Sequence, residues 1–363
     1  MKNSFGNAFT VTLFGESHGS AIGAVLDGLA PGLMVNEQSI ADKLALRRPA
    51  GDTATPRVEK DPFQIVSGVF EGKTTGTPLC IIIPNENTKS GDYNRCAPRP
   101  GHADYAAFVK YHGFEDYRGG GHFSGRITAA LVAAGAIITD VLSQKGVTLA
   151  THVYRCNEHC DGHFNNPIQQ IAALQHMAFP LLHPELEEPI KQVIRDARAK
   201  GDSVGGVIET AVCGMPAGVG EPWFDTVEGV LSHALFSVPA IKGVEFGDGF
   251  ALCDMLGSQA NDAFAVENGK IITTTNHNGG INGGITNGMP LVFRCAVKPT
   301  PSISKSQQSI DYASGQEIEL STKGRHDPAI FHRACHVVNA VTALTLYDLL
   351  CTRYGTDWFT KEG

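Results

Sequence analysis

The sequence of 363 residues is 42% hydrophobic and 18% charged, which is typical of a globular protein with a substantial core. Its formal net charge of −8 argues against a protein that coats nucleic acid, but leaves room for a local basic pocket that binds a small anion. No apolar run approaches the roughly 20 residues that span a bilayer, and no signal peptide is recognised. We therefore expect a cytoplasmic protein with no membrane or nucleic-acid partner, whose nine scattered cysteines are reduced thiols.

The N-terminal part of the chain is predicted to begin with two strands. Segments 9–14 and 21–29 are β-leaning, and the turn-prone, glycine-bounded segment 15–19 joins them. A helix is predicted over 39–48, because Ser39 can serve as its N-cap and Pro49 stops it. The next predicted elements are two strands and a helix, over 63–70, 78–83 and 102–112.

Three longer helices are predicted in the rest of the chain. Segment 126–142 is apolar and rich in alanine, so we expect it to be buried on most sides. Segment 186–200 is amphipathic and charged, and should expose one face. The last helix is predicted over 327–354, with Asp327 as its cap and Pro328 in its first turn.

A weak internal repeat of the form strand, turn, helix, strand is visible. Its first copy occupies 23–25, 31–32, 39–48 and 66–70, and its second occupies 206–208, 216–218, 226–236 and 242–246. The repeat is either a true duplication or the ordinary likeness of such units, and the sequence leaves both open.

The predicted elements favour an α+β fold. We expect one large domain over 1–363, with long buried helices sandwiched between mainly antiparallel sheets. No low-complexity linker divides the chain. Strands and helices do not alternate regularly enough for a doubly wound parallel sheet, and neither G-x-G-x-x-G after a strand nor a Walker phosphate loop is present.

Four glycine-rich segments concentrate polar residues, and each has a chemical and a structural interpretation. In 15–19, His18 lies on a glycine-flanked turn, where it can serve as a general acid or simply end a strand. In 99–105, Arg99 and His102 precede a predicted helix, whose N-terminus attracts anions, although this could equally be a plain cap with a solvated arginine.

The third segment, 117–126, has three consecutive glycines before the apolar helix. Such a backbone can lie against a flat ligand or cradle an anion, and Arg126 needs a partner if it is buried. The alternative is a flexible surface loop. The fourth segment, 323–328, brings Asp327 to a helix start, where capping alone would account for it. Loops 276–284 and 298–302 carry amides, hydroxyls and one lysine, which suit a phosphate or a flavin edge but also an ordinary loop.

Two further patterns are weak. Residues Cys156, His159, Cys160 and His163 resemble a zinc cluster, but their spacing departs from the usual paired arrangement, so we predict no metal site. The pattern G-x-S-x-G occurs at 15–19 and 201–205, yet neither copy fits a strand-to-helix elbow. A serine nucleophile is therefore not predicted.

Taken together, the motifs resemble those of the chorismate synthase family, in the family's order and spacing and over nearly the whole chain. The matching segments are Gly-Glu-Ser-His-Gly at 15–19, Arg-Pro-Gly-His-Ala-Asp-Tyr at 99–105, Tyr-Arg-Gly-Gly-Gly at 117–121, Lys-Gly-Val-Glu at 242–245, Lys-Pro-Thr at 298–300 and Gly-Arg-His-Asp-Pro at 324–328. Each motif is weak alone, and together they form a specific signal.

The resemblance implies a carbon–oxygen lyase of the shikimate pathway, which leads to the aromatic amino acids. Its reaction would be the anti-1,4-elimination of phosphate from 5-enolpyruvylshikimate-3-phosphate, giving chorismate. Reduced FMN would be required without net redox change, lending electron density as phosphate leaves and taking the C6 hydrogen at N5. A homotetramer and a separate flavin reductase are also implied.

The resemblance assigns roles to individual residues. His18 would protonate the departing phosphate, His102 would protonate the reduced flavin, and Asp327, with Ser17, would relay a proton at flavin N5. The residues matched to the substrate anions are Arg47, Arg48, Arg99 and Arg126, in keeping with arginine's bidentate binding of carboxylate and phosphate. The flavin contacts would fall on His122, Phe123, Ser124, Ala240, Gly283, Lys298, Pro299, Thr300, Pro301, Ser302 and Arg325.

The sequence departs from the family pattern after the triple glycine. Where the family commonly has Arg-Ser-Ser-Ala-Arg-Glu-Thr, this chain has His-Phe-Ser-Gly-Arg-Ile-Thr at 122–128. At 238–240 this chain has Val-Pro-Ala where the family commonly has Ile-Asn-Ala. At Thr53 it lacks an arginine that the family often has shortly after Arg-Arg-Pro. These changes bear on the flavin contacts and leave His18, His102, Arg126 and Asp327 in place.

Two other functions remain open on the sequence alone. One is a flavin oxidoreductase, although the chain lacks a dinucleotide fingerprint for a hydride donor. A bifunctional form that reduces its own flavin with NADPH is conceivable, but no long insertion suggests it. The other is a flavin- or anion-binding protein without catalysis.

Overall fold

The computed structural model describes residues 2–49, 60–86, 93–322 and 327–361. Two five-stranded sheets enclose a layer of helices, and all their strand pairs are antiparallel. The first sheet has the order β1-β2-β3-β7-β4, with β1 Ser4–Phe5, β2 Thr10–Gly15, β3 Ala21–Asp27, β7 Leu79–Pro84 and β4 Gln64–Ser67. The second has the order β11-β16-β10-β8-β9, with β11 Ile241–Phe246, β16 Leu291–Val297, β10 Gly206–Cys213, β8 Thr148–Cys156 and β9 His159–Cys160.

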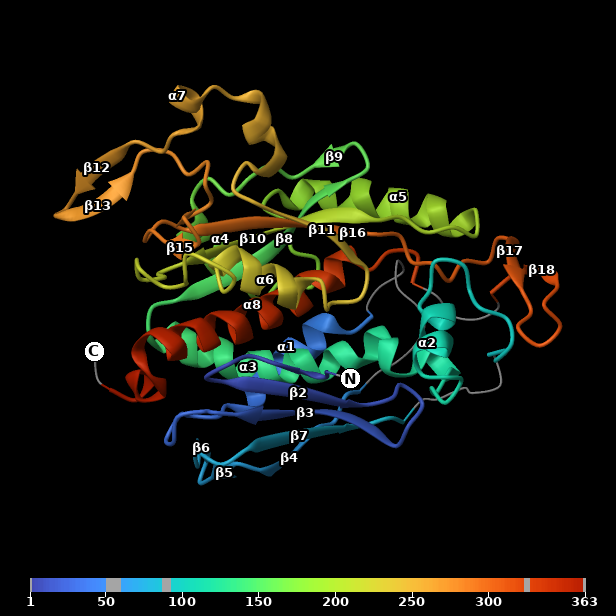
Figure 1. Ribbon diagram of the computed structural model, residues 1–363. Helices are drawn as coiled ribbons and strands as arrows, with labels where there is room; N and C mark the ends of the chain where they lie inside the picture. The colour runs from blue at the N-terminus through green and yellow to red at the C-terminus, as the bar shows by residue number, and fades with distance from the viewer. Residues whose placement is uncertain (1, 50–59, 87–92, 323–326, 362–363) are drawn as a thin grey trace.

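Helices lie between the two sheets (Figure 1). The central pair is α3 Thr128–Gln144 and α8 Phe331–Tyr354, which pack closely together, with α1 Glu37–Arg47 beside them and α6 Val227–Leu235 against α8. Outside this layer, α4 Pro167–Leu174 packs on β8 and β10. The other α-helices of the described chain are α2 Asp104–Lys110, α5 Glu187–Ala199 and α7 Gly257–Ala260.

The crossing of α3 and α8 depends on one small residue. A Cβ added to Gly135 would lie 2.4 Å from the Cβ of Ala340, so glycine lets the two backbones approach. Both helices are long and apolar enough to cross a membrane by length and composition, but 78% and 94% of their most apolar windows are buried inside the protein. This burial is what two core helices require, and it confirms the expectation for 126–142.

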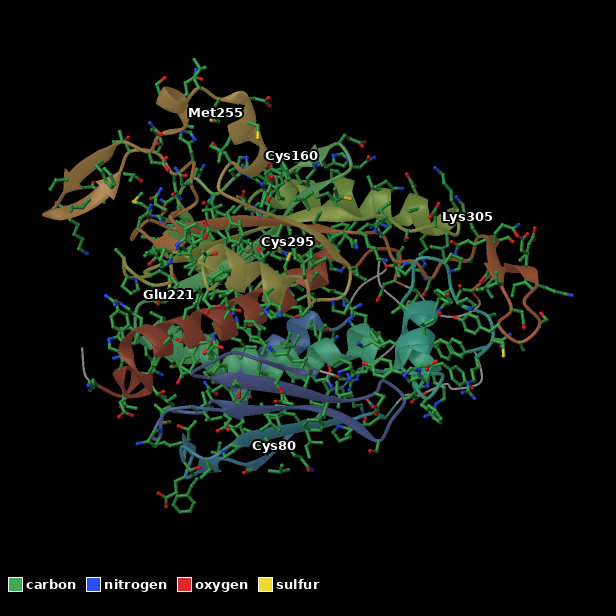
Figure 2. All side chains as sticks on the ribbon, viewed as in Figure 1. Cys80, Cys160, Glu221, Met255, Cys295 and Lys305 are labelled. Carbon is green, nitrogen blue, oxygen red and sulfur yellow. The ribbon has the colours of Figure 1, made fainter. Side chains whose placement is uncertain are left out.

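Short hairpins complete the fold. They are β5 Val69–Phe70 with β6 Lys73–Thr74, β12 Phe264–Glu267 with β13 Lys270–Thr273, β14 Ile281–Asn282 with β15 Ile285–Thr286, and β17 Gln307–Ile310 with β18 Glu317–Leu320. The β12–β13 hairpin and α7 form an arm that stands away from the layers, and Figure 2 shows Met255 on this arm.

The two sheets share one strand order. In the first, β3 is followed by α1, β4 and β7, and β7 lies between β3 and β4. In the second, β10 is followed by α6, β11 and β16, and β16 lies between β10 and β11. The repeat visible in the sequence therefore corresponds to a repeated topology, and the predicted α+β fold with helices between antiparallel sheets is confirmed.

Three of the differences between predicted and observed boundaries have a clear local cause. Helix α1 begins at Glu37 rather than at Ser39, because the side chain of Asn36 caps the amides of Gln38 and Ser39. The predicted strand over 63–70 is broken at Gly68, whose φ of +84° turns the chain into a separate hairpin.

The third difference concerns Asp327. Helix α8 begins at Phe331, and Ile330 at the N-cap position makes no side-chain cap bond. The prediction that Asp327 caps this helix is therefore wrong. Its carboxylate instead pairs with the guanidinium of Arg333 in the first turn of α8, where a charge-assisted bond replaces the cap.

All nine cysteines lie in the described part of the chain and none is in a disulfide. Figure 2 shows Cys80, Cys160 and Cys295 on separate strands. Cys156 is fully buried, His163 pairs with Glu209, and the described residues contain no group of three or more His, Cys, Asp or Glu able to hold a metal ion.

Candidate active site

A cavity of about 750 Å³ lies between the two halves of the molecule. Its apolar wall comes from β1, β2, α3, the end of α6 and α8, and includes Phe5, Leu13, Leu131, Phe236 and Leu344. The residues of the predicted cofactor set that line it are His122, Phe123, Ser124, Ala240, Lys298, Thr300, Pro301 and Ser302. A large, mostly apolar cavity with a few polar groups has the form of a cofactor site.

The polar groups of this cavity have defined contacts. Nδ1 of His122 donates to the carbonyl of Gly15 at 2.7 Å, and Nζ of Lys298 donates to the carbonyl of Gly101 at 2.6 Å. The hydroxyl of Ser124 accepts from the amide of Arg126 at 3.2 Å. In contrast, Oγ1 of Thr300 is buried and makes no hydrogen bond. A buried hydroxyl without a partner in a cavity wall is available to a bound polar group.

The triple glycine lies against three of the predicted catalytic residues, Ser17, His18 and His102. All three glycines have positive φ, between +52° and +82°. A Cβ on Gly119 would lie 2.4 Å from Oγ of Ser17 and 2.5 Å from the ring of His18, and one on Gly120 would lie 3.1 Å from the ring of His102. Only glycine permits both the backbone conformation and these close approaches, so this segment is a shaped wall rather than a flexible linker.

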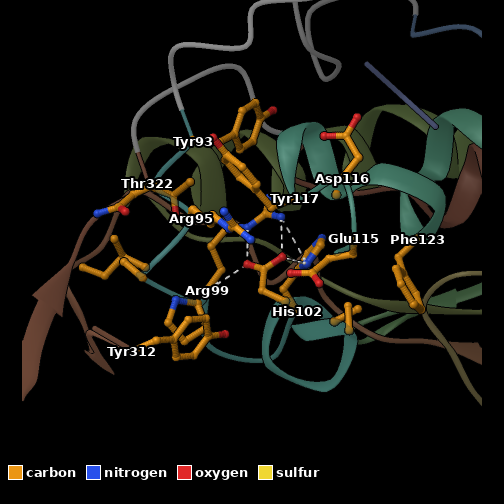
Figure 3. A pocket seen from close by; sticks show the side chains of 18 of the residues that line it. Tyr93, Arg95, Arg99, His102, Glu115, Asp116, Tyr117, Phe123, Tyr312 and Thr322 are labelled. Carbon is orange, nitrogen blue, oxygen red and sulfur yellow. Dashed lines mark hydrogen bonds and ion pairs between the residues drawn. The ribbon is translucent and has the colours of Figure 1, made fainter. Parts of the chain in front are cut away.

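A carboxylate that sequence analysis did not single out fixes His102. Oδ1 of Asp104 lies 2.6 Å from Nδ1 of His102 and 2.8 Å from Nη2 of Arg99, while Oδ2 accepts from Nε of Arg99 at 2.8 Å (Figure 3). Nδ1–H of His102 therefore donates to Asp104, which leaves Nε2 for chemistry. Burial would raise the pKa of Asp104, but its bonds to Arg99 and His102 outweigh burial and hold it well below its ordinary value.

A smaller cavity of about 160 Å³ shares His102 and Phe123 with the large one (Figure 3). Tyr93 and Tyr312 also line it. The ring of Tyr93 meets the ring of His18 edge to face, with 5.4 Å between their centroids. The glycine segment thus lies against both predicted catalytic histidines; His102 lines both cavities, and His18 is not among the described residues that line either of them.

His18 is also linked to Arg126 through one amide. The side chain of Asn85 donates to the carbonyls of Glu16 and Gly19, at 2.9 and 3.0 Å, on the turn that carries His18. Its oxygen accepts from Nε of Arg126 at 3.1 Å. Asn85 therefore fixes the position of the β2–β3 turn relative to the start of α3.

Three of the four predicted substrate arginines converge. Arg47 and Arg48 at the end of α1, and Arg126 just before α3, all face the carboxylate of Asp61. Burial would raise the pKa of Asp61, but the charges of Arg47 and Arg126 outweigh it and lower the pKa below its ordinary value. Arg99 stands apart from this group, against Asp104.

The other predicted site residues are distributed as follows. Ser17 is 1% exposed, and its hydroxyl donates to the carbonyl of Gly119 at 3.2 Å. Asp327 lines the large cavity. Pro299 and Gly283 are not among the described residues that line it, and Gly283 lies between β14 and β15. Arg325 falls outside the described residues.

Sequence reasoning missed Asp61 and Asp104. Asp104 carried a usable signal, because it stands two residues after His102 in a segment already singled out. Asp61 carried no such signal, because Arg48, Arg47 and Arg126, which it meets, are 13, 14 and 65 positions away in sequence.

Known proteins give an independent comparison. A sequence model of the chorismate synthase family matches residues 9–351. Chorismate synthase of Aeropyrum pernix is 46% identical over 361 residues, which cover 97% of this chain and 93% of that protein. Chorismate synthase of Lachnoclostridium phytofermentans is 47% identical over 355 residues, covering 96% and 95%.

A solved structure agrees with these relatives. It is a crystal structure of chorismate synthase, with a TM-score of 0.75 and 28% sequence identity to this chain. The match covers 96% of this chain and 94% of the chain in that structure. The resemblance noted in the motifs is confirmed, and so is the prediction of an enzyme of the lyase class. The chain belongs to the chorismate synthase family.

Proposed function

We propose that this protein converts 5-enolpyruvylshikimate-3-phosphate to chorismate and phosphate by anti-1,4-elimination, with reduced FMN in the large cavity. The observation that carries the proposal is the convergence of separate motifs on that cavity, where His102, Ser124, Lys298 and Asp327 share one lining. Family membership supports the reaction class.

The large cavity fits a flavin. Its volume of about 750 Å³ and its apolar walls suit a flat ring system, and the unbonded hydroxyl of Thr300 beside Lys298 suits a polar or anionic part of the same ligand. The walls would hold the cofactor through the residues at 122–124, Ala240 and 298–302, and we propose that Arg325 joins them. Reduced FMN, when bound, would supply electron density to the substrate as phosphate leaves.

The substrate would be bound by guanidinium groups. Arg47, Arg48 and Arg126 form one cationic cluster, and Arg99 lies in the wall of the smaller cavity. Arginine's planar fork of donors matches phosphate and carboxylate oxygens, and partial burial strengthens the attraction. These groups would orient the substrate and stabilise the negative charge that develops on the departing phosphate.

Two histidines would handle protons. His18, held beside Gly119 and Tyr93, would donate a proton to the leaving phosphate. His102 would carry its transferable proton at Nε2, because Nδ1–H is engaged by Asp104. Asp327 and Ser17 would take part in the proton relay at the cavity. The apolar walls would exclude water from the reacting atoms.

Replacing each histidine separates catalysis from mere binding. We expect His18→Asn and His102→Asn to lower kcat by about 10²- to 10⁴-fold, because each removes a positioned proton donor, while substrate and FMN affinity change little. Substrate turnover and FMN binding would be measured side by side. Variants that keep wild-type turnover would contradict the proposed roles, and a wild-type protein that binds both ligands without turnover would favour a binding protein.

We also propose a cytoplasmic homotetramer supplied with reduced flavin by a separate reductase. The assembly is supported by the arm of α7, β12 and β13. On this arm, Leu256, Phe264, Val266 and Ile271 are each at least 69% exposed. Apolar side chains gathered on a projecting segment are typical of a protein interface.

A further inference from the structure

The arginine cluster is built around an internal carboxylate. Asp61 lies within 3.3 Å of Nη2 of Arg47 and 3.6 Å of Nε of Arg48, and it pairs with Nη1 of Arg126 through its other oxygen. Its side chain is fully buried, and those of Arg47 and Arg126 are 3% and 5% exposed. One carboxylate thus contacts three guanidinium groups, of which those of Arg47 and Arg126 are almost fully buried, while the side chain of Arg48 is 29% exposed.

Asp61 is the shared partner of three guanidinium groups within the part of the chain that the structure describes. Nε of Arg48 is buried and lies 3.6 Å from Oδ2 of Asp61, too far for a hydrogen bond, so its N–H is held near the carboxylate by charge alone. Without a central anion, like charges at this spacing would repel one another and turn apart.

The backbone of Asp61 is held in an unfavourable conformation. Its φ is +48°, a region that residues other than glycine rarely adopt. Such a conformation persists only where surrounding contacts enforce it, and such positions gather at functional sites. The ion pairs of Asp61 join the end of α1 to the start of α3, and Nε of Arg333 on α8 donates to the carbonyl of Arg47 at 2.8 Å.

We propose that Asp61 is a positioning residue for substrate binding, which keeps Arg47, Arg48 and Arg126 convergent and ready to receive an anion. The inference rests on the proposed function, in which these arginines bind the substrate's phosphate and carboxylates. Asp61 itself touches the arginines rather than the reacting atoms. Its loss would disperse the cationic site while leaving the proton donors His18 and His102 in place.

The test compares Asp61→Asn with Asp140→Asn. The first removes the charge with little change of shape, and the second is a control, because Asp140 also ties α1 to α3, through Oγ of Ser39 at 3.0 Å, without contacting the arginine cluster. KM and kcat for 5-enolpyruvylshikimate-3-phosphate would be measured with reduced FMN. Melting temperature and the affinity for inorganic phosphate would be measured on the same samples.

We expect Asp61→Asn to raise KM by about tenfold or more and to weaken phosphate binding similarly, and to lower kcat as well, because the same arginines would stabilise the charge on the departing phosphate. Asp140→Asn should keep KM and phosphate affinity near the wild-type values even where it lowers the melting temperature. Wild-type KM and phosphate affinity in Asp61→Asn would overturn the inference, and so would tighter binding, since Asp61 would then compete with the substrate.

Two provisions keep the test decisive. If Asp61→Asn fails to fold, Asp61→Glu carries the test, because the displaced carboxylate should still raise KM about threefold, and an unchanged KM contradicts the inference. If the wild-type protein forms no chorismate, the proposed function fails. The phosphate affinities of the variants then test Asp61 alone.

Discussion

Carboxylates that flank the cationic residues are the recurring feature at the residue scale. Asp104 engages both Arg99 and His102, Asp61 engages three arginines, and Asp327 pairs with Arg333. Each carboxylate fixes the direction of an arginine or histidine side chain that could contact a ligand. Such support is what holds a site in its productive geometry.

The position of His102 can be tested through Asp104. We expect Asp104→Asn to lower kcat by about one to two orders of magnitude, because the imidazole of His102 loses the carboxylate that fixes its tautomer. This loss is smaller than the whole contribution of a positioned proton donor, which is about 10²- to 10⁴-fold. Steady-state kinetics of the folded variant would measure this. Asp202→Asn is the control, since Asp202 pairs with Lys305 at the surface. Equal kcat in both variants would show that Asp104 does not position His102.

The sequence indicated which residues take part in the site, but not which residues pair with one another. His18, His102 and Arg126 could be singled out because histidine and arginine within glycine-rich segments are typical of sites that transfer protons or bind anions. The pairing of Asp61 with Arg126 could not, because it joins residues 65 positions apart and exists only once α1 and α3 are packed.

At the scale of elements, the glycine segment 119–121 decides how closely the catalytic groups approach. We expect Gly119→Ala to reduce kcat/KM by at least about tenfold, because its Cβ would displace Ser17 or His18. Gly146→Ala is the matched control, since Gly146 also has a positive φ, +76°, but nothing lies within 4 Å of the added Cβ. Both variants place alanine at a positive φ and should share that loss of stability on thermal melting, to which Gly119→Ala adds the clash with Ser17 and His18. Activity lost equally in both would assign the effect to backbone strain.

Helix α8 carries a pH-dependent contribution to stability. Burial lowers the pKa of His332 to about 3, and burial likewise lowers that of His336 to about 4. Between these values and the unfolded pKa of about 6.5, the unfolded chain binds more protons than the folded protein, so stability falls as pH decreases through this window. Each histidine contributes a slope of up to about 1.4 kcal/mol per pH unit.

This contribution can be measured by urea denaturation at several pH values. The contribution of these two histidines to the free energy of unfolding should be nearly constant from pH 8 to 7. It should decline from about pH 6.5 to pH 4.5. His332→Phe, which keeps a ring against Phe179, should reduce that slope. A variant with an unchanged slope would show that His332 does not remain neutral in the folded protein.

Elements with strong patterns were predictable, and their ends were not. Helices α3 and α8 followed from long apolar segments, which a soluble fold can only bury. The start of α8 was misplaced because Asp327 has the chemistry of a cap, while its carboxylate is drawn to Arg333. The strand over 63–70 was misjudged because a single glycine with positive φ ends the pairing.

At the scale of the whole molecule, the repeated topology explains where the large cavity lies. Each half contributes a sheet and a central helix, α3 or α8, and the cavity forms where the halves meet. The sequence showed the repeat and the motifs, but it could not show that 122–124 and 298–302 share one wall. That proximity depends on packing between segments far apart in the chain.

The proposed tetramer has a direct test. We expect light scattering at micromolar concentration to give a mass four times that of one chain, and we expect serine at both Phe264 and Ile271 to lower it, because these exposed side chains would leave an apolar interface. Phe114→Ser is the control, since Phe114 is 92% exposed but lies outside the arm. A monomeric wild-type protein would contradict the proposed assembly, and a tetramer insensitive to the arm changes would place the interface elsewhere.

The stoichiometry of the anaerobic reaction distinguishes the proposed lyase activity from flavin oxidation. Purified protein would be given 5-enolpyruvylshikimate-3-phosphate with reduced FMN, with oxidised FMN or without flavin, and chorismate, phosphate and reduced FMN would be followed together. We expect equal amounts of chorismate and phosphate, only with reduced FMN and without its net consumption. Consumption of one reduced flavin per turnover, or no chorismate from folded protein with flavin bound, would contradict it.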